Sequence, residues 1–194
     1  AKKSKDDQKE MSVWTVEEFE QFIACVDHPI YNAFFRCLYW AGLRKGEAIA
    51  LLKTDLTDQQ DLLISKTIYR KEVHSPKTNA GTRSVRLDDE TYKYLLPLTK
   101  RAGRYLFGDL APLSTSQIDR YFLAGIKKSG VPKIRIHDLR HSHATNLINA
   151  GANIVAVSKR LGHSDVSMTL KVYTHLLQKT DEQLINTLNC LAKG

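Results

Sequence analysis

The chain has 194 residues, with 29 lysines and arginines against 21 aspartates and glutamates, and a formal net charge of +8 at pH 7. Hydrophobic residues make up 42% of it and charged residues 26%. This composition excludes an intrinsically disordered chain and is typical of a globular protein. The length predicts one domain, or one domain with a small subdomain. The basic excess favours an anionic partner but does not by itself specify nucleic acid.

The apolar runs do not predict membrane insertion or secretion. The longest run, from Tyr31 to Leu43, is broken by Arg36 and is too short to cross a bilayer. The charged first ten residues precede no apolar stretch, so we expect no secretory signal there. The cysteines fit neither a disulfide framework nor a zinc ribbon, and we expect buried thiols in a reducing compartment. They are Cys25, Cys37 and Cys190.

The first fifty residues predict a charged tail followed by helices. Residues 1–11 are unpatterned, which is typical of a tail or an interdomain linker. Thr15 and Glu18 have the spacing of a capping box, and Gly42 is expected to end a largely buried helix. The helices are expected over residues 15–26, 30–40 and 45–52.

Between residues 61 and 88, short runs rich in β-branched residues replace the helical pattern. Pro76, Asn79 and Gly81 mark a turn between these runs, so we expect a small antiparallel sheet. Helices are expected again over residues 89–101 and 114–129, and as four short helices after residue 137. The predicted fold class is therefore α+β, mainly α-helical with a small antiparallel β-sheet.

One predicted helix carries cationic groups on its apolar side. On a helical wheel, His137 and Arg140 fall on the same side as Ala144 and Ile148, whereas His143 falls on the other side. A surface helix normally separates its charges from its apolar stripe. This arrangement suits a recessed anion site, to which free backbone N–H groups and the helix dipole would contribute. It equally suits structural hydrogen bonds at a helix start.

The next segment contains a glycine-ended helix and a tyrosine on an apolar face. His163 directly follows Gly162, and Val166, Leu170 and Tyr173 share one face of a further helix. Taken singly, His163 also fits a loop residue and Tyr173 a core residue.

Taken together, these motifs resemble the signatures of the tyrosine recombinases, the phage integrase family. The motifs are Ala41–Glu47 (Gly-Leu-Arg-x-x-Glu), Pro76-Lys77-Thr78 with residues 83–87, His137–Arg140, and Leu161–Ser164 with Tyr173-Thr174-His175. The resemblance covers roughly residues 12–190. It implies that residues 12–194 are a catalytic domain with that family's fold. The N-terminal core-binding domain and any arm-binding domain would then be absent from this chain.

The resemblance also implies a reaction. Tyr173 would attack the scissile phosphate of DNA, forming a 3′-phosphotyrosyl link and freeing a 5′-hydroxyl. Strand exchange and religation would follow, for integration or excision of a mobile element. Arg44 and Arg140 would hold the phosphate oxygens with paired N–H donors, which lysine cannot supply.

Four further residues receive roles from the same resemblance. Lys77 would protonate the leaving 5′-oxygen. His137 and His163 would support proton transfer and hold the phosphate, while Glu47 would orient an arginine or a histidine. Lys66 and Lys71, also in the sheet region, are alternatives to Lys77 as the group that protonates the 5′-oxygen. His141 and His143 are expected to be structural, and neither a metal nor a cofactor is expected.

The partner expected from the resemblance is double-stranded DNA, bound by a tetramer on two recombination sites, with the isolated domain monomeric. The last predicted helix, Asp181–Leu191, has one apolar face, which either packs on its own domain or contacts a neighbouring subunit. No membrane partner is expected. The location implied is the cytoplasm of a bacterial host, in association with the nucleoid.

Rival interpretations stay open at this point. Residues 155–170 have the pattern of a helix-turn-helix, which would fit a non-enzymatic DNA-binding protein. A type IB topoisomerase uses similar tyrosine chemistry. A metal-dependent hydrolase would instead use the clustered histidines. These are His137, His141, His143 and His163.

Overall fold

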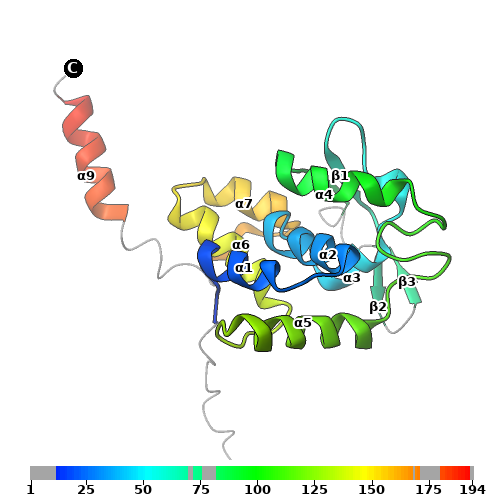
Figure 1. Ribbon diagram of the computed structural model, residues 1–194. Coiled ribbons are helices and arrows are strands. Elements are labelled where there is room, and N and C mark those ends of the chain that lie inside the picture. The colour runs from blue at the N-terminus through cyan, green and yellow to red at the C-terminus, as the bar shows by residue number, and fades with distance from the viewer. Residues whose placement is uncertain (1–11, 70–71, 76–81, 168, 171–179, 193–194) are drawn as a thin grey trace, which may run out of the picture.

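The computed structural model of the protein describes residues 12–69, 72–75, 82–167, 169–170 and 180–192. Helices form most of this part of the chain, and short strands lie along one side of the helical body (Figure 1). The helices are α1 (Val16–Ala24), α2 (Pro29–Trp40), α3 (Lys45–Ala50), α4 (Asp89–Thr99), α5 (Thr115–Ser129), α6 (Asp138–Asn149), α7 (Ile154–Leu161) and α9 (Thr180–Leu191), with a short 3-10 helix over Lys53–Asp55. The strands are β1 (Asp61–Ile64), β2 (Thr67–Tyr69), β3 (Glu72–His74) and β4 (Arg83–Arg86).

The first helices begin where the sequence predicts them. The Glu18 backbone N–H donates to the Thr15 hydroxyl at 3.2 Å, and the Thr15 N–H donates to the Glu18 carboxylate at 2.9 Å. This confirms the capping box. The next helix, α2, contacts α1, α4 and α6, so its aromatic residues can be buried on several sides. Phe34 and Phe35, for example, are fully buried.

The strands form two separate antiparallel ladders rather than the single small sheet that the sequence predicts. In the first, β1 pairs with β4 and Leu62 lies opposite Val85. In the second, β2 pairs with β3 and Ile68 lies opposite Val73. The sequence does not predict β3 because all three of its residues are exposed, so they carry no alternation of buried and exposed positions. The predicted turn at residues 76, 79 and 81 lies outside the described residues.

Helix α6 is buried on more than the one side that the helical wheel predicts. Ala144 is buried as expected, but Ser142 and His143 are buried as well. The reason is that α6 contacts both α2 and α7. Its polar side chains therefore need protein partners. The Ser142 hydroxyl, for instance, accepts the Trp14 N–H at 2.8 Å and donates to the Asp138 carbonyl oxygen at 2.8 Å.

The prediction of three buried thiols is correct for Cys37 alone. Cys25 is half-buried and Cys190 is exposed. Cys25 is the C-cap of α1, where the chain leaves the helix, and Cys190 belongs to α9, whose described side chains are exposed. No helix in the described part of the chain is both long and apolar enough to span a bilayer.

Helix α9 stands apart from the helical body (Figure 1). Its apolar residues are more than half exposed, at 51–74% of their full accessible area. They are Leu184, Ile185, Leu188 and Leu191. In the described residues, this apolar face therefore does not pack on its own domain, which was one of the two expectations for the helix.

Candidate active site

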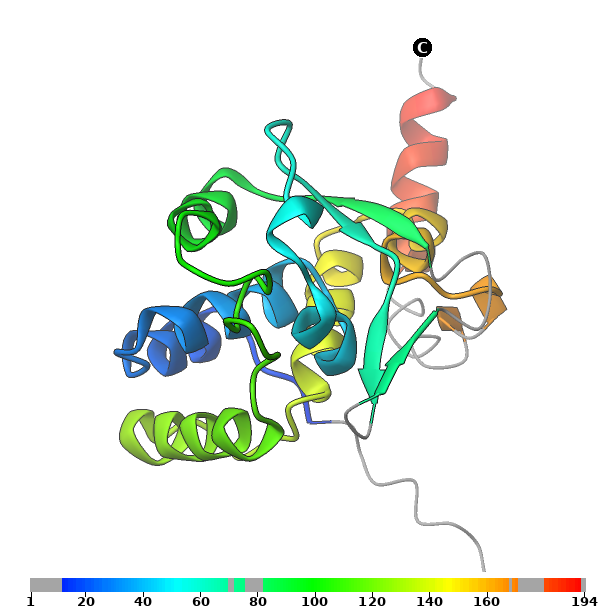
Figure 2. The same ribbon diagram turned by 90° about the vertical axis from the view of Figure 1, so that its right-hand side faces the viewer.

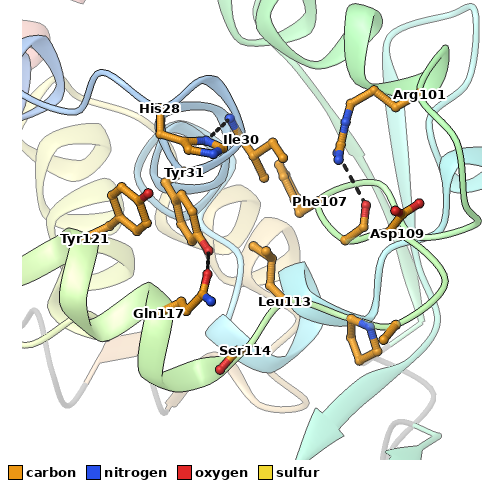
Figure 3. Close-up of a pocket in the computed structure, with 13 residues that line it drawn as sticks. His28, Ile30, Tyr31, Arg101, Phe107, Asp109, Leu113, Ser114, Gln117 and Tyr121 are labelled. Carbon is orange, nitrogen blue, oxygen red and sulfur yellow. Dashed lines mark hydrogen bonds between the residues drawn. The ribbon is translucent and has the colours of Figure 1, made fainter.

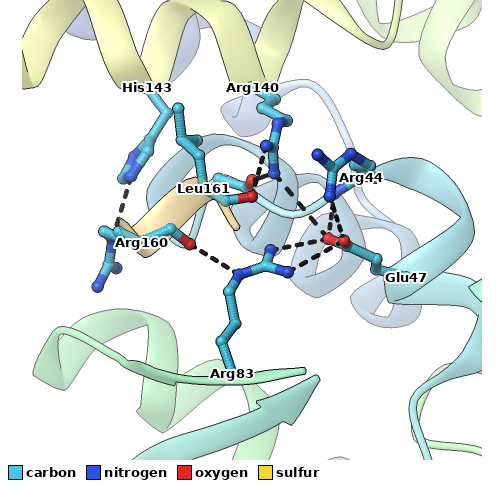
Figure 4. A network of polar contacts seen from close by, with 8 residues as sticks. Arg44, Glu47, Arg83, Arg140, His143, Arg160 and Leu161 are labelled. Atoms are coloured by element: carbon cyan, nitrogen blue, oxygen red, sulfur yellow. Dashed lines mark hydrogen bonds and ion pairs between the residues drawn. The ribbon is translucent and has the colours of Figure 1, made fainter. Parts of the chain in front are cut away.

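Arg140 is held by backbone carbonyl oxygens from two distant segments. Its Nη1 donates to the Gly42 oxygen at 2.7 Å, and its Nη2 donates to the Leu161 oxygen at 2.6 Å (Figure 4). The residue is only 3% exposed. These bonds tie the N-terminal turn of α6 to the segment after α2 and to the end of α7. The plane of the guanidinium is thereby set before any ligand arrives.

Gly42 makes this arrangement possible in two ways. Its φ angle is +67°, a left-handed conformation that glycine adopts without steric cost. A Cβ atom at this position would also lie 2.5 Å from the Cδ2 atom of His143. The carbonyl that receives Arg140 therefore sits on a backbone segment that has no room for a side chain.

We expect Gly42→Ala to destabilise the fold by about 2–4 kcal/mol, because left-handed strain and the collision with His143 add up. The matched control is Gly130→Ala. Gly130 has a similar φ of +74°, but nothing lies within 4 Å of its added Cβ. The control should lose only about 1 kcal/mol. Urea unfolding of both variants measures the difference, and equal losses would mean that the His143 contact has no energetic importance.

Glu47 is the buried carboxylate around which the arginines gather. Its Oε1 accepts the Arg44 Nη1 at 2.7 Å and the Arg83 Nη1 at 3.1 Å. Its Oε2 accepts the Arg44 backbone N–H at 2.9 Å and the Arg83 Nη2 at 2.9 Å. The Arg140 Nη1 lies 4.0 Å from the same Oε2. A single carboxylate thus links guanidinium groups from α6, from β4 and from the start of α3.

The neighbouring arginines keep Glu47 ionised. Burial opposes its ionisation, yet the hydrogen bonds and charges of Arg83 and Arg44 lower its pKa to about 2. Arg44 differs from the other two arginines because its side chain is 38% exposed, against 7% for Arg83 and 4% for Arg140. Within the described residues, Glu47 is the only hydrogen-bond partner of the Arg44 guanidinium. Arg44 therefore presents part of its donor set to the surface.

The pKa values of the two candidate histidines lie below the ordinary value of a histidine. Burial, followed by the charges of Arg140 and Arg44, lowers the pKa of His163 to about 4. Its Nδ1 lies 2.7 Å from the hydroxyl of Thr169, which is fully buried and fixes the ring. Partial desolvation, followed by the charge of Arg140, lowers the pKa of the exposed His137. Neutral rings can accept a proton, whereas imidazolium groups cannot.

The sequence left two interpretations of the start of α6 open, free N–H groups for an anion or structural hydrogen bonds, and the backbone N–H groups follow the second. The N–H groups of Asp138, Leu139 and Arg140 donate to the carbonyl oxygens three residues earlier, at 2.9–3.2 Å. A tight turn before the helix therefore satisfies donors that an anion could otherwise use. The ring of His141 meets that of His137 edge to face, with centroids 4.8 Å apart. The Nε2 atom of the buried His143 accepts a hydrogen bond from Arg160 at 3.1 Å, so the expected structural role fits it.

The structure brings the described candidates into one neighbourhood, with Arg44, Glu47 and Arg140 in a single polar network and the two histidines within reach of its charge. Lys77 and Tyr173 lie outside the described residues. The sequence motifs do not mark Arg83 as a site residue. A signal for it existed, because side chains alternate along a strand and Arg83 falls on the same face of β4 as the buried Val85.

The sequence profile of the phage integrase family matches residues 13–180. The chain belongs to the phage integrase family. It is 29% identical to the ICEBs1 integrase of Bacillus subtilis (strain 168), over 94% of this chain and 55% of that protein. It is 32% identical to the tyrosine recombinase XerD of Rhizobium meliloti (strain 1021), over 84% of this chain and 52% of that protein. This phage integrase family chain spans about half the length of the curated relatives it matches.

Solved structures confirm the fold class of this family member. The crystal structure of XerA recombinase matches with a TM-score of 0.71 and 26% identity, over 91% of this chain and 64% of that one. The Tn1549 transposon integrase, solved in complex with circular intermediate DNA, matches with a TM-score of 0.82 and 24% identity, over 94% of this chain and 69% of that one. The α+β fold predicted from the motifs is therefore that of the phage integrase family.

A separate open cavity of about 310 Å³ lies at the other end of α2 (Figure 3). The Tyr31 hydroxyl donates to Gln117 there at 2.7 Å, and Tyr31 stacks on Tyr121 with ring centroids 3.8 Å apart. None of the residues that the sequence predicts for the site lines this cavity, so it is not part of the candidate active site. Among the described residues, no three His, Cys, Asp or Glu side chains are grouped so that they could hold a metal ion.

Proposed function

We propose that residues 12–194 are the catalytic domain of a site-specific DNA recombinase, an integrase that breaks and rejoins DNA to insert or excise a mobile element. One observation carries the proposal: Arg44 and Arg140, from motifs almost a hundred positions apart, are both oriented around the buried Glu47. Membership of the phage integrase family supports it, as do the names of the relatives, which are integrases and recombinases.

The arginines suit a phosphodiester substrate. Phosphoryl transfer develops negative charge on the nonbridging oxygens, and guanidinium groups can donate to two such oxygens at once. Arg140 is rigid because two carbonyls hold it, and Arg44 is partly exposed beside it. In this proposal both arginines hold the scissile phosphate. No metal ion takes part, because the arginine, lysine and histidine side chains can neutralise a phosphate by themselves. No ATP takes part, because the covalent ester keeps the energy of the phosphodiester bond.

The proposed reaction conserves the energy of the phosphodiester bond. The Tyr173 oxygen attacks phosphorus, the bond to the 5′-oxygen breaks, and a 3′-phosphotyrosyl ester forms. Lys77 gives its proton to the departing 5′-oxygen. The neutral ring of His137 or His163 takes the tyrosine proton, which their lowered pKa values allow at pH 7. Religation reverses these steps with the 5′-hydroxyl of a second duplex.

Double-stranded DNA and further copies of the chain are the proposed partners. We place the complete enzyme as a tetramer on two recombination sites, in a bacterial cytoplasm at the nucleoid, with the isolated domain monomeric. An N-terminal core-binding domain would encircle the duplex, and residues 1–11 would link it to this domain. The exposed apolar face of α9 is the candidate contact with a neighbouring subunit.

Covalent trapping tests the proposal. The substrates are nicked suicide duplexes made from both ends of the mobile element that encodes the chain, in which the cleaved fragment diffuses away and religation fails. A protein–DNA adduct that survives denaturation is expected, and peptide mapping should place the DNA on Tyr173. Non-covalent binding alone would favour the helix-turn-helix alternative, and covalent cleavage without strand exchange between two duplexes would favour a topoisomerase.

The general acid can be tested by changing the leaving group. We expect Lys77→Ala to slow cleavage of ordinary DNA by on the order of 10²-fold. A substrate with sulfur at the bridging 5′ position should restore the rate, because a thiolate leaves without a proton. The matched controls are Lys66→Ala and Lys71→Ala, which should cleave both substrates normally. A Lys77→Ala defect that persists on the sulfur substrate would mean that Lys77 only contacts the phosphate.

A further inference from the structure

Arg83 holds Glu47 with its guanidinium alone, which bonds both carboxylate oxygens. Its Nη1 and Nη2 donate one to each carboxylate oxygen, at 3.1 and 2.9 Å (Figure 4). Both side chains are 7% exposed. This parallel pair of bonds leaves the carboxylate little rotational freedom, because turning it would break both bonds together.

Arg83 also connects this carboxylate to the segment beside His163. Its Nε donates to the carbonyl oxygen of Arg160 at 2.8 Å. The next carbonyl oxygen along α7, that of Leu161, holds Arg140 at 2.6 Å. One guanidinium on β4 thus spans the start of α3 and the end of α7, the two places from which Arg44 and Arg140 are held.

Arg44 depends on this support. Its partly exposed guanidinium has Glu47 as its only hydrogen-bond partner in the described part of the chain, at 2.7 Å. An exposed arginine samples many rotamers unless a fixed acceptor selects one of them. The orientation of Glu47 therefore selects the orientation of the Arg44 guanidinium, and Arg83, together with the Arg44 backbone N–H, fixes that of Glu47.

We propose that Arg83 is a positioning residue of the phosphate site: it aligns Glu47, and through Glu47 the guanidinium of Arg44, for bidentate contact with the scissile phosphate. This inference rests on the proposed function and adds to it a residue that touches neither DNA nor the reacting atoms. A lysine at position 83 would keep the positive charge but could not bond both carboxylate oxygens in parallel. The substitution would therefore remove the alignment of the Glu47 carboxylate but keep its charge balanced.

The test compares Arg83→Lys with Arg86→Lys. Arg86 lies on the same strand but is 64% exposed and pairs with Asp61, so its loss leaves the Glu47 network intact. Single-turnover cleavage of the nicked duplexes separates two quantities: the amplitude reports the folded, competent fraction, and the rate constant reports geometry. We expect Arg83→Lys to lower the rate constant by about 10- to 100-fold. DNA affinity should stay within about twofold, and Arg86→Lys should match the wild type in rate.

A double-mutant cycle shows whether Arg83 acts through Glu47. Glu47→Gln removes the carboxylate that Arg83 aligns, so adding Arg83→Lys to it should cost less than threefold further. A role that is only structural would reduce amplitude and Tm and leave the rate constant unchanged. An effect on the rate constant that is independent of Glu47 would instead add fully to the Glu47→Gln effect. Either an unchanged rate constant in Arg83→Lys or full additivity would overturn the inference.

A second pair of variants tests the inference if Arg83→Lys fails to fold. Removing one partner of a buried ion pair can be strongly destabilising. If Arg83→Lys shows no cooperative unfolding transition, the rate constants of Glu47→Gln and Glu47→Gln/Arg83→Gln are compared instead, because in the double variant positions 47 and 83 form a neutral amide pair. Equal rate constants support the inference and a further tenfold loss contradicts it. Absence of an adduct in the wild type would contradict the proposed function instead, so the two failures are distinguishable.

Discussion

Replacing Tyr173 with phenylalanine is expected to abolish covalent adduct formation. The substitution removes the one oxygen that attacks phosphorus, and no side chain among the described residues is proposed to replace it. DNA binding should stay within about twofold of the wild type, because no proposed phosphate contact is lost. Denaturing gels of the suicide substrate measure the adduct, and fluorescence anisotropy of the intact duplex measures binding.

The control for this experiment is Tyr94→Phe. Tyr94 is 41% exposed, and its ring lies under the Arg36 guanidinium at 4.2 Å, a contact that phenylalanine also makes. This variant should form adduct at the wild-type rate. Normal adduct levels in Tyr173→Phe would show that another residue is the nucleophile, and peptide mapping would then identify it.

Replacing Arg140 with lysine is expected to slow cleavage by on the order of 10²-fold or more. Loss of one preorganised donor costs roughly 3 kcal/mol in a transition state of this kind. Here a structural loss adds to it, since one ammonium group cannot replace the fork that bonds both Gly42 and Leu161. We therefore expect Arg140→Lys to lower Tm as well. Single-turnover cleavage and thermal unfolding measure the two effects.

Arg44→Lys provides the comparison. It should slow cleavage to a similar extent but change Tm little, because the Arg44 side chain is 38% exposed and the other arginines still pair with Glu47. Arg120→Lys, on the surface of α5, is the neutral control for both. Wild-type cleavage in Arg44→Lys and Arg140→Lys would argue that the arginines have no part in the reaction and would favour a DNA-binding protein without catalysis.

Local signals in the sequence were sufficient to predict most helices and the family. The capping box of α1 and the glycine after α2 act over three or four residues, so their effect can be derived from spacing alone. The family motifs are likewise short, and the match of the integrase profile to residues 13–180 confirms what they indicate. These motifs also predict Arg44 and Arg140 as site residues, and the structure places both beside Glu47.

The strand region and α6 show where local signals fail. β3 is an exposed pair partner of β2, and only the pairing defines it. The helical wheel of α6 assumes one buried face, but contacts with α2 and α7 bury His143 on the opposite side. The N–H groups at the start of α6 are satisfied by the preceding turn, which no helix-start pattern distinguishes from a free terminus.

By itself, the sequence determined the fold class, the family and the identity of the candidate phosphate-binding arginines, because these depend on residue type and on spacing along the chain. Only the tertiary structure decided how the site is held together. It placed Arg83 between Glu47 and the Arg160 carbonyl, and Arg140 between the carbonyls of Gly42 and Leu161. Such contacts join segments 21–98 positions apart, so their geometry depends on packing that no local pattern encodes.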